Sequence, residues 1–133
     1  MKTKIIKQKI FITASSEEVY NAFVDVKIHS AFTGAKATGT AKEGSEFTAW
    51  DGYITGKHLK LVKGKKIVQE WTTTEWPKGA ESSKLELTFT AKKDGTELTV
   101  VHSKVPAKQA SDYSNGWKKF YWDPFKKYFS NKK

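Results

Sequence analysis

The chain has 133 residues, the size of one domain, which is enough to bury roughly two-thirds of the surface of the unfolded chain. It contains no cysteine, which excludes disulfides, thiolate metal sites and cysteine nucleophiles. The net charge is +10, but all 24 basic residues are lysine. Because arginine supplies the planar group that binds guanine or phosphate in a bidentate way, we expect no sequence-specific nucleic-acid binding.

The amino-terminal segment is apolar only in part. Ile5, Ile6 and Ile10 are interrupted by Lys7 and Lys9, so no continuous apolar region of a signal peptide is present. The rest of the sequence contains no apolar run long enough to cross a membrane. We therefore expect a cytoplasmic protein without membrane insertion.

The first part of the chain predicts one strand and one or two short helices. Residues 3–12 alternate isoleucine with lysine and glutamine, which is typical of a half-buried strand. Ser15 and Glu18 have the spacing of a capping box at a helix start. The apolar residues that follow at helical spacing are Val19, Ala22, Phe23 and Val26. Residues 27–34 predict a second short helix or turn that ends at Gly34.

Residues 35–105 predict about six short antiparallel strands separated by glycine turns. Asp51-Gly52 and Asp94-Gly95 are dipeptides of tight hairpins, because they tolerate a positive φ. Residues 76–83 predict a loop. In the last two strands strict alternation predicts these inward-facing side chains: Leu85, Leu87, Phe89, Leu98, Val100 and His102.

Residues 106–129 predict one long amphipathic helix. At about 100° per residue, an arc of roughly 140° contains most of its aromatic side chains. These are Tyr113, Trp117, Phe120, Tyr121, Phe125 and Tyr128. Pro124 removes an amide donor and predicts a kink near Asp123, or else a break into two helices. Gly116 predicts a close backbone approach to another element.

The order of these elements predicts an α+β domain. A strongly curved antiparallel sheet wrapped around the long C-terminal helix is the compact way to cover both apolar surfaces. One or two short helices follow the first strand. The space between sheet and helix is then either a packed core or a cavity.

This layout resembles the START-like superfamily of helix-grip domains, and within it the family homologous to the activator of the heat-shock chaperone ATPase. The resemblance rests on segments in the same order along the chain: ASSEEVYNAF (14–23), IVQEW (67–71), WPKG (76–79), GTELTV (95–100), GW (116–117) and YWDPFK (121–126). It implies a single helix-grip domain over residues 1–133. In the chaperone activators the domain of this type looks like a docking module, and other members of the superfamily bind hydrophobic molecules or are cyclases or hydrolases.

The chemistry-bearing residues predict neither a metal site nor a cofactor. His29, His58 and His102 are far apart and lack the spacing of metal ligands. His102 is interpreted as a core histidine with a satisfied hydrogen bond, with a polar contact to a ligand as the alternative. Asp51 and Asp94 are explained by turns. We name no catalytic residue.

Three hypotheses for function follow. The leading one is a non-catalytic domain that binds a small hydrophobic or amphipathic molecule between sheet and helix, lined by Phe23, Trp50, Tyr53, Trp71, Phe89, His102, Trp117 and Tyr121. The second is a co-chaperone-like docking module that uses lysines and the exposed aromatic side chains Trp76 and Trp122 against an acidic partner such as a heat-shock chaperone. The third is an enzyme of the cyclase or hydrolase type.

Overall fold

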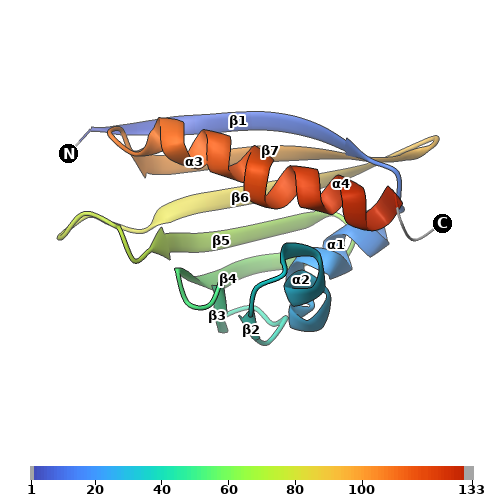
Figure 1. Ribbon diagram of the computed structural model, residues 1–133, viewed down its shortest axis with the longest axis horizontal. Coiled ribbons are helices and arrows are strands. Elements are labelled where there is room, and N and C mark those ends of the chain that lie inside the picture. The colour runs from blue at the N-terminus through green and yellow to red at the C-terminus, as the bar shows by residue number, and fades with distance from the viewer. Residues whose placement is uncertain (1, 131–133) are drawn as a thin grey trace.

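The computed structural model describes residues 2–130 as one antiparallel sheet covered by helices (Figure 1). In this part of the chain the sheet has seven strands in the order β1-β7-β6-β5-β4-β3-β2. Their bounds are β1 Thr3–Ile12, β2 Thr38–Gly39, β3 Glu46–Ala49, β4 Ile54–Val62, β5 Lys66–Thr73, β6 Ser83–Lys92 and β7 Gly95–Pro106. From β2 to β7 each strand pairs with the next along the chain, and β1 closes the series on β7, which confirms the predicted meander.

The helices lie on one side of the sheet, with the terminal helix running across it and the two short helices near its carboxyl end (Figure 1). Their bounds are α1 Ser16–Val24, α2 Val26–Thr33, α3 Ala110–Trp117, the π-helical turn η1 Lys118–Trp122 and α4 Asp123–Ser130. The predicted α+β helix-grip fold is therefore confirmed.

The capping box and the second short helix are present as predicted. Ser15 Oγ accepts a hydrogen bond from the backbone N–H of Glu18, whose carboxylate accepts from the Ser15 N–H in return. Asp25 ends α1 and caps α2. The prediction that Val26 belongs to the first helix is therefore wrong, because this residue begins the second. Gly34 ends α2 in the left-handed conformation, at φ 77°.

The concave face of the sheet forms the core. Leu85, Leu87 and Phe89 on β6 are buried, whereas the residues between them are not fully buried, as the alternation predicted. The inward set of β7 is buried in the same way and ends at His102. Sheet and terminal helix therefore share one continuous apolar core.

The two predicted aspartate–glycine hairpins differ in structure. At the first, Asp51 and Gly52 have φ 57° and 90°, as expected, but the strands stop at Ala49 and Ile54. The connection therefore has four residues, and Trp50 and Tyr53 lie outside the strands. At the second, Lys92 pairs with Gly95, so the turn is Lys93-Asp94. Gly95 belongs to β7, where a Cβ would overlap the Ile12 carbonyl oxygen.

The terminal helix starts at Ala110, four residues later than predicted, because β7 continues to Pro106. It neither breaks nor stays α-helical before Pro124. The N–H of Asp123 bonds to the carbonyl of Lys118, five residues back. This π-helical turn gives room to a proline ring that would collide with the preceding turn of an α-helix. An ion pair between Lys118 Nζ and Asp123 Oδ2, at 3.1 Å, bridges the same turn.

The π-helical turn also changes which aromatic residues are buried. One extra residue in a turn rotates all later positions back by about 100°. Trp122 and Phe129, which fell outside the predicted arc, are therefore buried. Phe120, at the edge of that arc, is 47% exposed.

Candidate functional site

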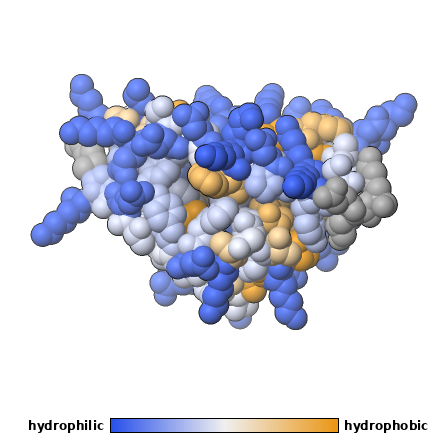
Figure 2. Space-filling model, viewed as in Figure 1, coloured by the Kyte–Doolittle hydropathy of each residue, from blue (hydrophilic) through white to orange (hydrophobic). Residues whose placement is uncertain are grey.

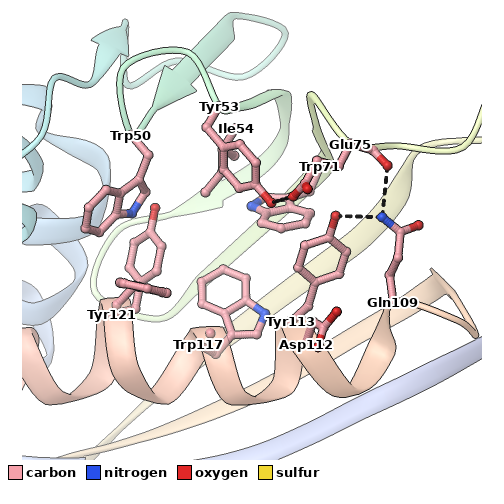
Figure 3. Close-up of a pocket in the computed structure, with 12 residues that line it drawn as sticks. Trp50, Tyr53, Ile54, Trp71, Glu75, Gln109, Asp112, Tyr113, Trp117 and Tyr121 are labelled. Atoms are coloured by element: carbon pink, nitrogen blue, oxygen red, sulfur yellow. Dashed lines mark hydrogen bonds between the residues drawn. The ribbon is translucent and has the colours of Figure 1, made fainter.

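A cavity of about 550 Å³ separates part of the terminal helix from the sheet (Figure 3). Five predicted lining residues do line it: Trp50, Tyr53, Trp71, Trp117 and Tyr121. Four further residues of its apolar wall are Ile54, Tyr113, Gly116 and Phe120. Three polar residues complete it: Glu75, Gln109 and Asp112. The volume lies within the range of small-molecule sites, and the lining is mainly aromatic.

Trp71 forms the sheet side of the cavity and Trp117 the helix side. Their ring centroids lie 5.5 Å apart, and Tyr113 packs edge-on against Trp71 at 5.4 Å. Gly116 immediately precedes Trp117 on the helix. A Cβ at that position would meet only one Phe120 ring carbon, at 3.8 Å. The close backbone approach predicted for Gly116 is therefore wrong, and the missing side chain leaves space in the cavity.

The β3–β4 turn covers one end of the cavity (Figure 3). Trp50 packs edge-on against Phe120 at 5.5 Å and against Tyr121 at 6.3 Å. Its backbone is left-handed, at φ 54°, a conformation that is costly for a bulky residue. Asp51 holds the turn in place, since its side chain accepts from the Lys36 N–H at 3.0 Å and its N–H donates to the Lys36 carbonyl, also at 3.0 Å.

The other end of the cavity is polar (Figure 3). Gln109 Nε2 donates to the Tyr113 hydroxyl at 3.1 Å and to the Glu75 carbonyl at 2.9 Å. The Tyr113 hydroxyl also bonds to Thr73 Oγ1 at 2.7 Å. The Tyr53 hydroxyl donates to the Glu75 carboxylate, and burial together with this carboxylate raises the pKa of Tyr53. The site is thus apolar at one end and able to form hydrogen bonds at the other.

His102 lies behind the cavity wall and does not line it. Its Nδ1 accepts from the Trp117 indole N–H at 3.1 Å, so Nε2 carries the proton and donates to Ser83 Oγ at 2.7 Å. Ser83 in turn donates to the Trp71 carbonyl at 2.6 Å. Burial lowers the pKa of His102 to about 3. Neutral His102 therefore positions Trp117 from the core, as the interpretation of a satisfied core histidine predicts.

Two further predicted lining residues also lie outside the cavity. Phe89 is buried beneath α1, where it meets Tyr20 edge-on at 5.8 Å. Phe23 packs between His29 and Tyr121, at 5.3 and 5.7 Å. It borders a separate void of about 20 Å³, room for a single water molecule. Alternation and helical spacing placed both residues on the correct faces, but they could not show where the core is closed.

Tyr121 connects the cavity to this second layer. The His29 ring donates from Nδ1 to the Phe23 carbonyl at 2.9 Å, so Nε2 accepts from the Tyr121 hydroxyl at 3.0 Å. Burial lowers the pKa of His29 and raises that of Tyr121. Both side chains therefore stay neutral near pH 7 and hold the Tyr121 ring in one orientation.

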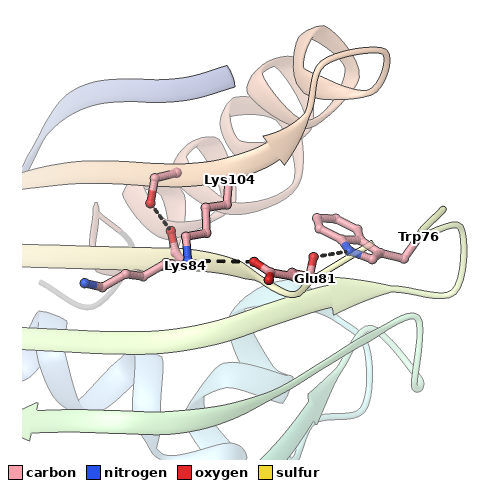
Figure 4. A network of polar contacts seen from close by, with 5 residues as sticks. Trp76, Glu81, Lys84 and Lys104 are labelled. Atoms are coloured by element: carbon pink, nitrogen blue, oxygen red, sulfur yellow. Dashed lines mark hydrogen bonds and ion pairs between the residues drawn. The ribbon is translucent and has the colours of Figure 1, made fainter. Parts of the chain in front are cut away.

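The two predicted partner anchors occupy different environments. Trp76 is half-buried in the β5–β6 loop, where its indole N–H donates to the Glu81 carbonyl at 2.8 Å and Lys104 lies 3.9 Å from the Glu81 carboxylate (Figure 4). Its ring stacks on Tyr113 at 5.9 Å. The expectation that Trp122 is exposed is wrong. Because of the π-helical turn, Trp122 is only 2% exposed and is not available to a partner.

Comparison with known proteins identifies the family. The model of the family described as "Activator of Hsp90 ATPase homolog 1-like protein" matches residues 13–130. The chain belongs to this family.

Relatives of this family member include "Activator of 90 kDa heat shock protein ATPase homolog 1" of Homo sapiens, which is 35% identical over 126 residues. That match covers 95% of the chain and 37% of the human protein. The corresponding activator homologue of Dictyostelium discoideum is 34% identical, over 96% of the chain and 33% of the relative. The chain thus spans about a third of the length of these relatives.

Two solved structures agree with the fold. A structure described as an HSP90 activator from Plasmodium falciparum superimposes with a TM-score of 0.77 at 25% identity, covering 91% of each chain. The solution structure of an Aha1 dimer from Colwellia psychrerythraea has a TM-score of 0.81 at 18% identity, covering 98% of this chain and 99% of that one.

Sequence reasoning missed several residues of the cavity in this family member. Tyr113 and Phe120 were on the predicted aromatic face and could have been included from that signal. Glu75, Gln109 and Asp112 carry no pattern that places them, because each lies at an element end or in a loop. Within residues 2–130, no three metal-ligating side chains are grouped to hold an ion. No helix in the same range is long and apolar enough to span a bilayer.

Proposed function

We propose that this chain is a docking domain that binds a 90 kDa heat-shock chaperone. The observation that carries this proposal is the 35% identity to a human activator of that chaperone's ATPase, which extends over 95% of the chain. Identity at this level over a whole domain supports a shared partner more strongly than fold similarity would.

The charge of the surface supports an acidic partner. Lys119, Lys126 and Lys127 on the terminal helix are exposed, and the structure gives them no ion pair among the described residues. Lys119 is next to Phe120, an exposed large apolar side chain of that helix, and its Nζ lies 5.4 Å from the centroid of the Phe120 ring. On the face in Figure 2, hydrophilic side chains surround apolar atoms that reach the surface. A lysine-rich surface that also exposes an apolar side chain suits electrostatically steered association.

Direct binding to a purified 90 kDa heat-shock protein tests this proposal. We expect saturable binding that weakens steeply as salt is raised from 50 to about 300 mM. The triple variant Lys119→Glu, Lys126→Glu and Lys127→Glu should bind at least about tenfold more weakly. Its matched control changes three exposed lysines of the opposite sheet face, Lys9→Glu, Lys60→Glu and Lys84→Glu, with the same change in net charge.

The possible results distinguish whether the chaperone is the partner from which face of the domain binds it. Absence of binding by the unchanged protein at low salt overturns the docking function. If instead the control variant loses binding and the helix variant keeps it, the chaperone is the partner but the sheet carries the contact.

A second function, binding of a small hydrophobic or amphipathic molecule, is favoured by one specific observation, the aromatic cavity of about 550 Å³. Its apolar wall would gain about 25 cal/mol for each Å² of apolar surface removed from water. The neutral dye N-phenyl-1-naphthylamine, which fluoresces in apolar surroundings, should bind with a stoichiometry of about one. Gly116→Leu places a side chain in the cavity and should abolish dye binding without unfolding the protein, since a Cβ at this position is unobstructed.

A further inference from the structure

The sign of the charge in the cavity is opposite to that of the whole protein. The chain carries a net charge of +10 with 24 lysines, yet no lysine lines the cavity. The charged residues of its lining are Glu75 and Asp112. We propose that the cavity binds a hydrophobic ligand that carries a positively charged amine. This inference rests on the second function proposed above and names the chemical class of its ligand.

The aromatic wall independently favours a cation. Faces of tryptophan, tyrosine and phenylalanine attract ammonium groups, by about 0.5–1 kcal/mol at exposed sites and about 2 where water is excluded. The protein already contains one such contact at this site, with Lys119 Nζ lying 5.4 Å from the centroid of the Phe120 ring. A carboxylate ligand would meet the negative faces of the same rings and the two acidic side chains together.

At the polar end of the cavity, two carboxylates have oxygen atoms that are free to accept further hydrogen bonds. Glu75 accepts a hydrogen bond from Tyr53 through Oε1 only, among the described residues. The Asp112 carboxylate has neither a hydrogen bond nor an ion pair in that part of the chain. Gln109 lies between them and orients the neighbouring Tyr113 hydroxyl. An ammonium group with up to three N–H donors fits acceptors of this kind.

The two ends of the cavity set the orientation of the ligand. In Figure 3, Trp50 and Tyr121 lie at the end away from Glu75 and Gln109, with Trp117 between the two ends. The apolar body of the ligand would therefore lie between Trp50 and Trp117, with its amine directed toward Glu75. This geometry favours an elongated amine over a compact one.

Displacement of bound N-phenyl-1-naphthylamine by a matched pair of ligands tests the inference. The pair is 2-(2-naphthyl)ethylamine and 2-naphthylacetate, which share an aromatic body and carry opposite charges. We expect the amine to displace the dye at a concentration about tenfold lower than the carboxylate. The double variant Glu75→Gln and Asp112→Asn removes the two negative charges that attract the amine and repel the carboxylate. It should therefore reduce this preference to less than about threefold.

The control variant removes two carboxylates from the outer face of the sheet. Glu46→Gln with Glu97→Gln changes the net charge by the same amount and should keep the full preference for the amine. Equal or better displacement by 2-naphthylacetate overturns the inference, as does an unchanged preference in the Glu75→Gln and Asp112→Asn variant. In both cases dye binding itself still supports the cavity function. If the dye does not bind, or binds Gly116→Leu equally well, the cavity function fails and the inference fails with it.

Discussion

The indole N–H of Trp117 donates to Nδ1 of His102 across 3.1 Å, and so joins the terminal helix to the last strand inside the core. Because an indole N–H can only donate, the acceptor nitrogen must be unprotonated. The hydrogen bond therefore requires a neutral histidine. The position of the Trp117 ring, which lines the cavity, thus depends on the protonation state of His102, which does not line it.

Stability is expected to fall on acidification. His102 has a pKa of about 3 in the folded protein and an ordinary value of 6.5 when unfolded, so between these limits the unfolded state binds more protons. The free energy of unfolding, measured in urea, should stay nearly constant from pH 8 to 7. Below about pH 6.5 it should decrease by up to about 1.4 kcal/mol per pH unit for this histidine. Burial lowers the pKa values of His29 and His58 in the same direction.

His102→Asn isolates this contribution. The asparagine carbonyl can still accept from the Trp117 indole N–H, but the ionisable group is lost. The difference in stability between the unchanged protein and the variant should narrow from pH 7 to pH 5. A difference that is the same at both pH values would show that His102 does not titrate in this way.

Replacing Gly116 by alanine should stabilise the protein by about 0.5–1 kcal/mol, because glycine inside a helix is unfavourable and the added Cβ meets no obstacle. The midpoint of urea unfolding measures this change. Gly56→Ala is the matched control and should destabilise, since its Cβ would overlap the Glu70 carbonyl oxygen. Loss of stability in Gly116→Ala would contradict an open cavity beside the helix.

Trp122→Ala should cost about 3–5 kcal/mol of unfolding free energy, as expected for a large buried aromatic side chain. Trp122 stacks on Trp117 at 5.1 Å, and its indole N–H donates to Gln8 at 2.6 Å. Trp122→Phe should cost less, because only the hydrogen bond and part of the ring are lost. Denaturant unfolding of the two variants measures both losses of unfolding free energy. A loss below about 1 kcal/mol for Trp122→Ala would argue that the Trp122 ring is exposed.

Asp51→Val should destabilise the β3–β4 turn by about 2 kcal/mol. The substitution places a β-branched residue at φ 57° and removes the acceptor of the Lys36 N–H. Asp51→Gly loses the same acceptor but relaxes the backbone, so its cost should be clearly smaller. Equal unfolding free energies for the two variants would mean that the left-handed conformation is not costly here.

Most of the fold could be predicted because local patterns carried it. Alternation in residues 85–89 and the capping box at Ser15 depend on neighbours a few residues away, and the structure agrees with both. The long aromatic helix was also correct as an element. Its phase was not, because Pro124 can be accommodated by a kink, a break or a π-helical turn, and helical periodicity does not choose among them.

The candidate site depended more on distance in space than on pattern. Aromatic residues at Trp50, Trp71 and Trp117 could be assigned to the interior from the sequence, since large apolar rings are costly in water. Glu75 and Gln109 could not, because they are 34 residues apart and meet only when the loop after β5 reaches the start of the terminal helix.

The sequence by itself determined the class of fold, the family resemblance and the faces of most strands, because hydrophobic periodicity and capping act over a few residues. Only the tertiary structure decided that His102 does not line the cavity, that Trp122 is buried and that Gly116 opens onto a cavity. These outcomes depend on how the terminal helix rotates and how far it stands from the sheet. Both are set by the packing of side chains from distant parts of the chain, which no local pattern records.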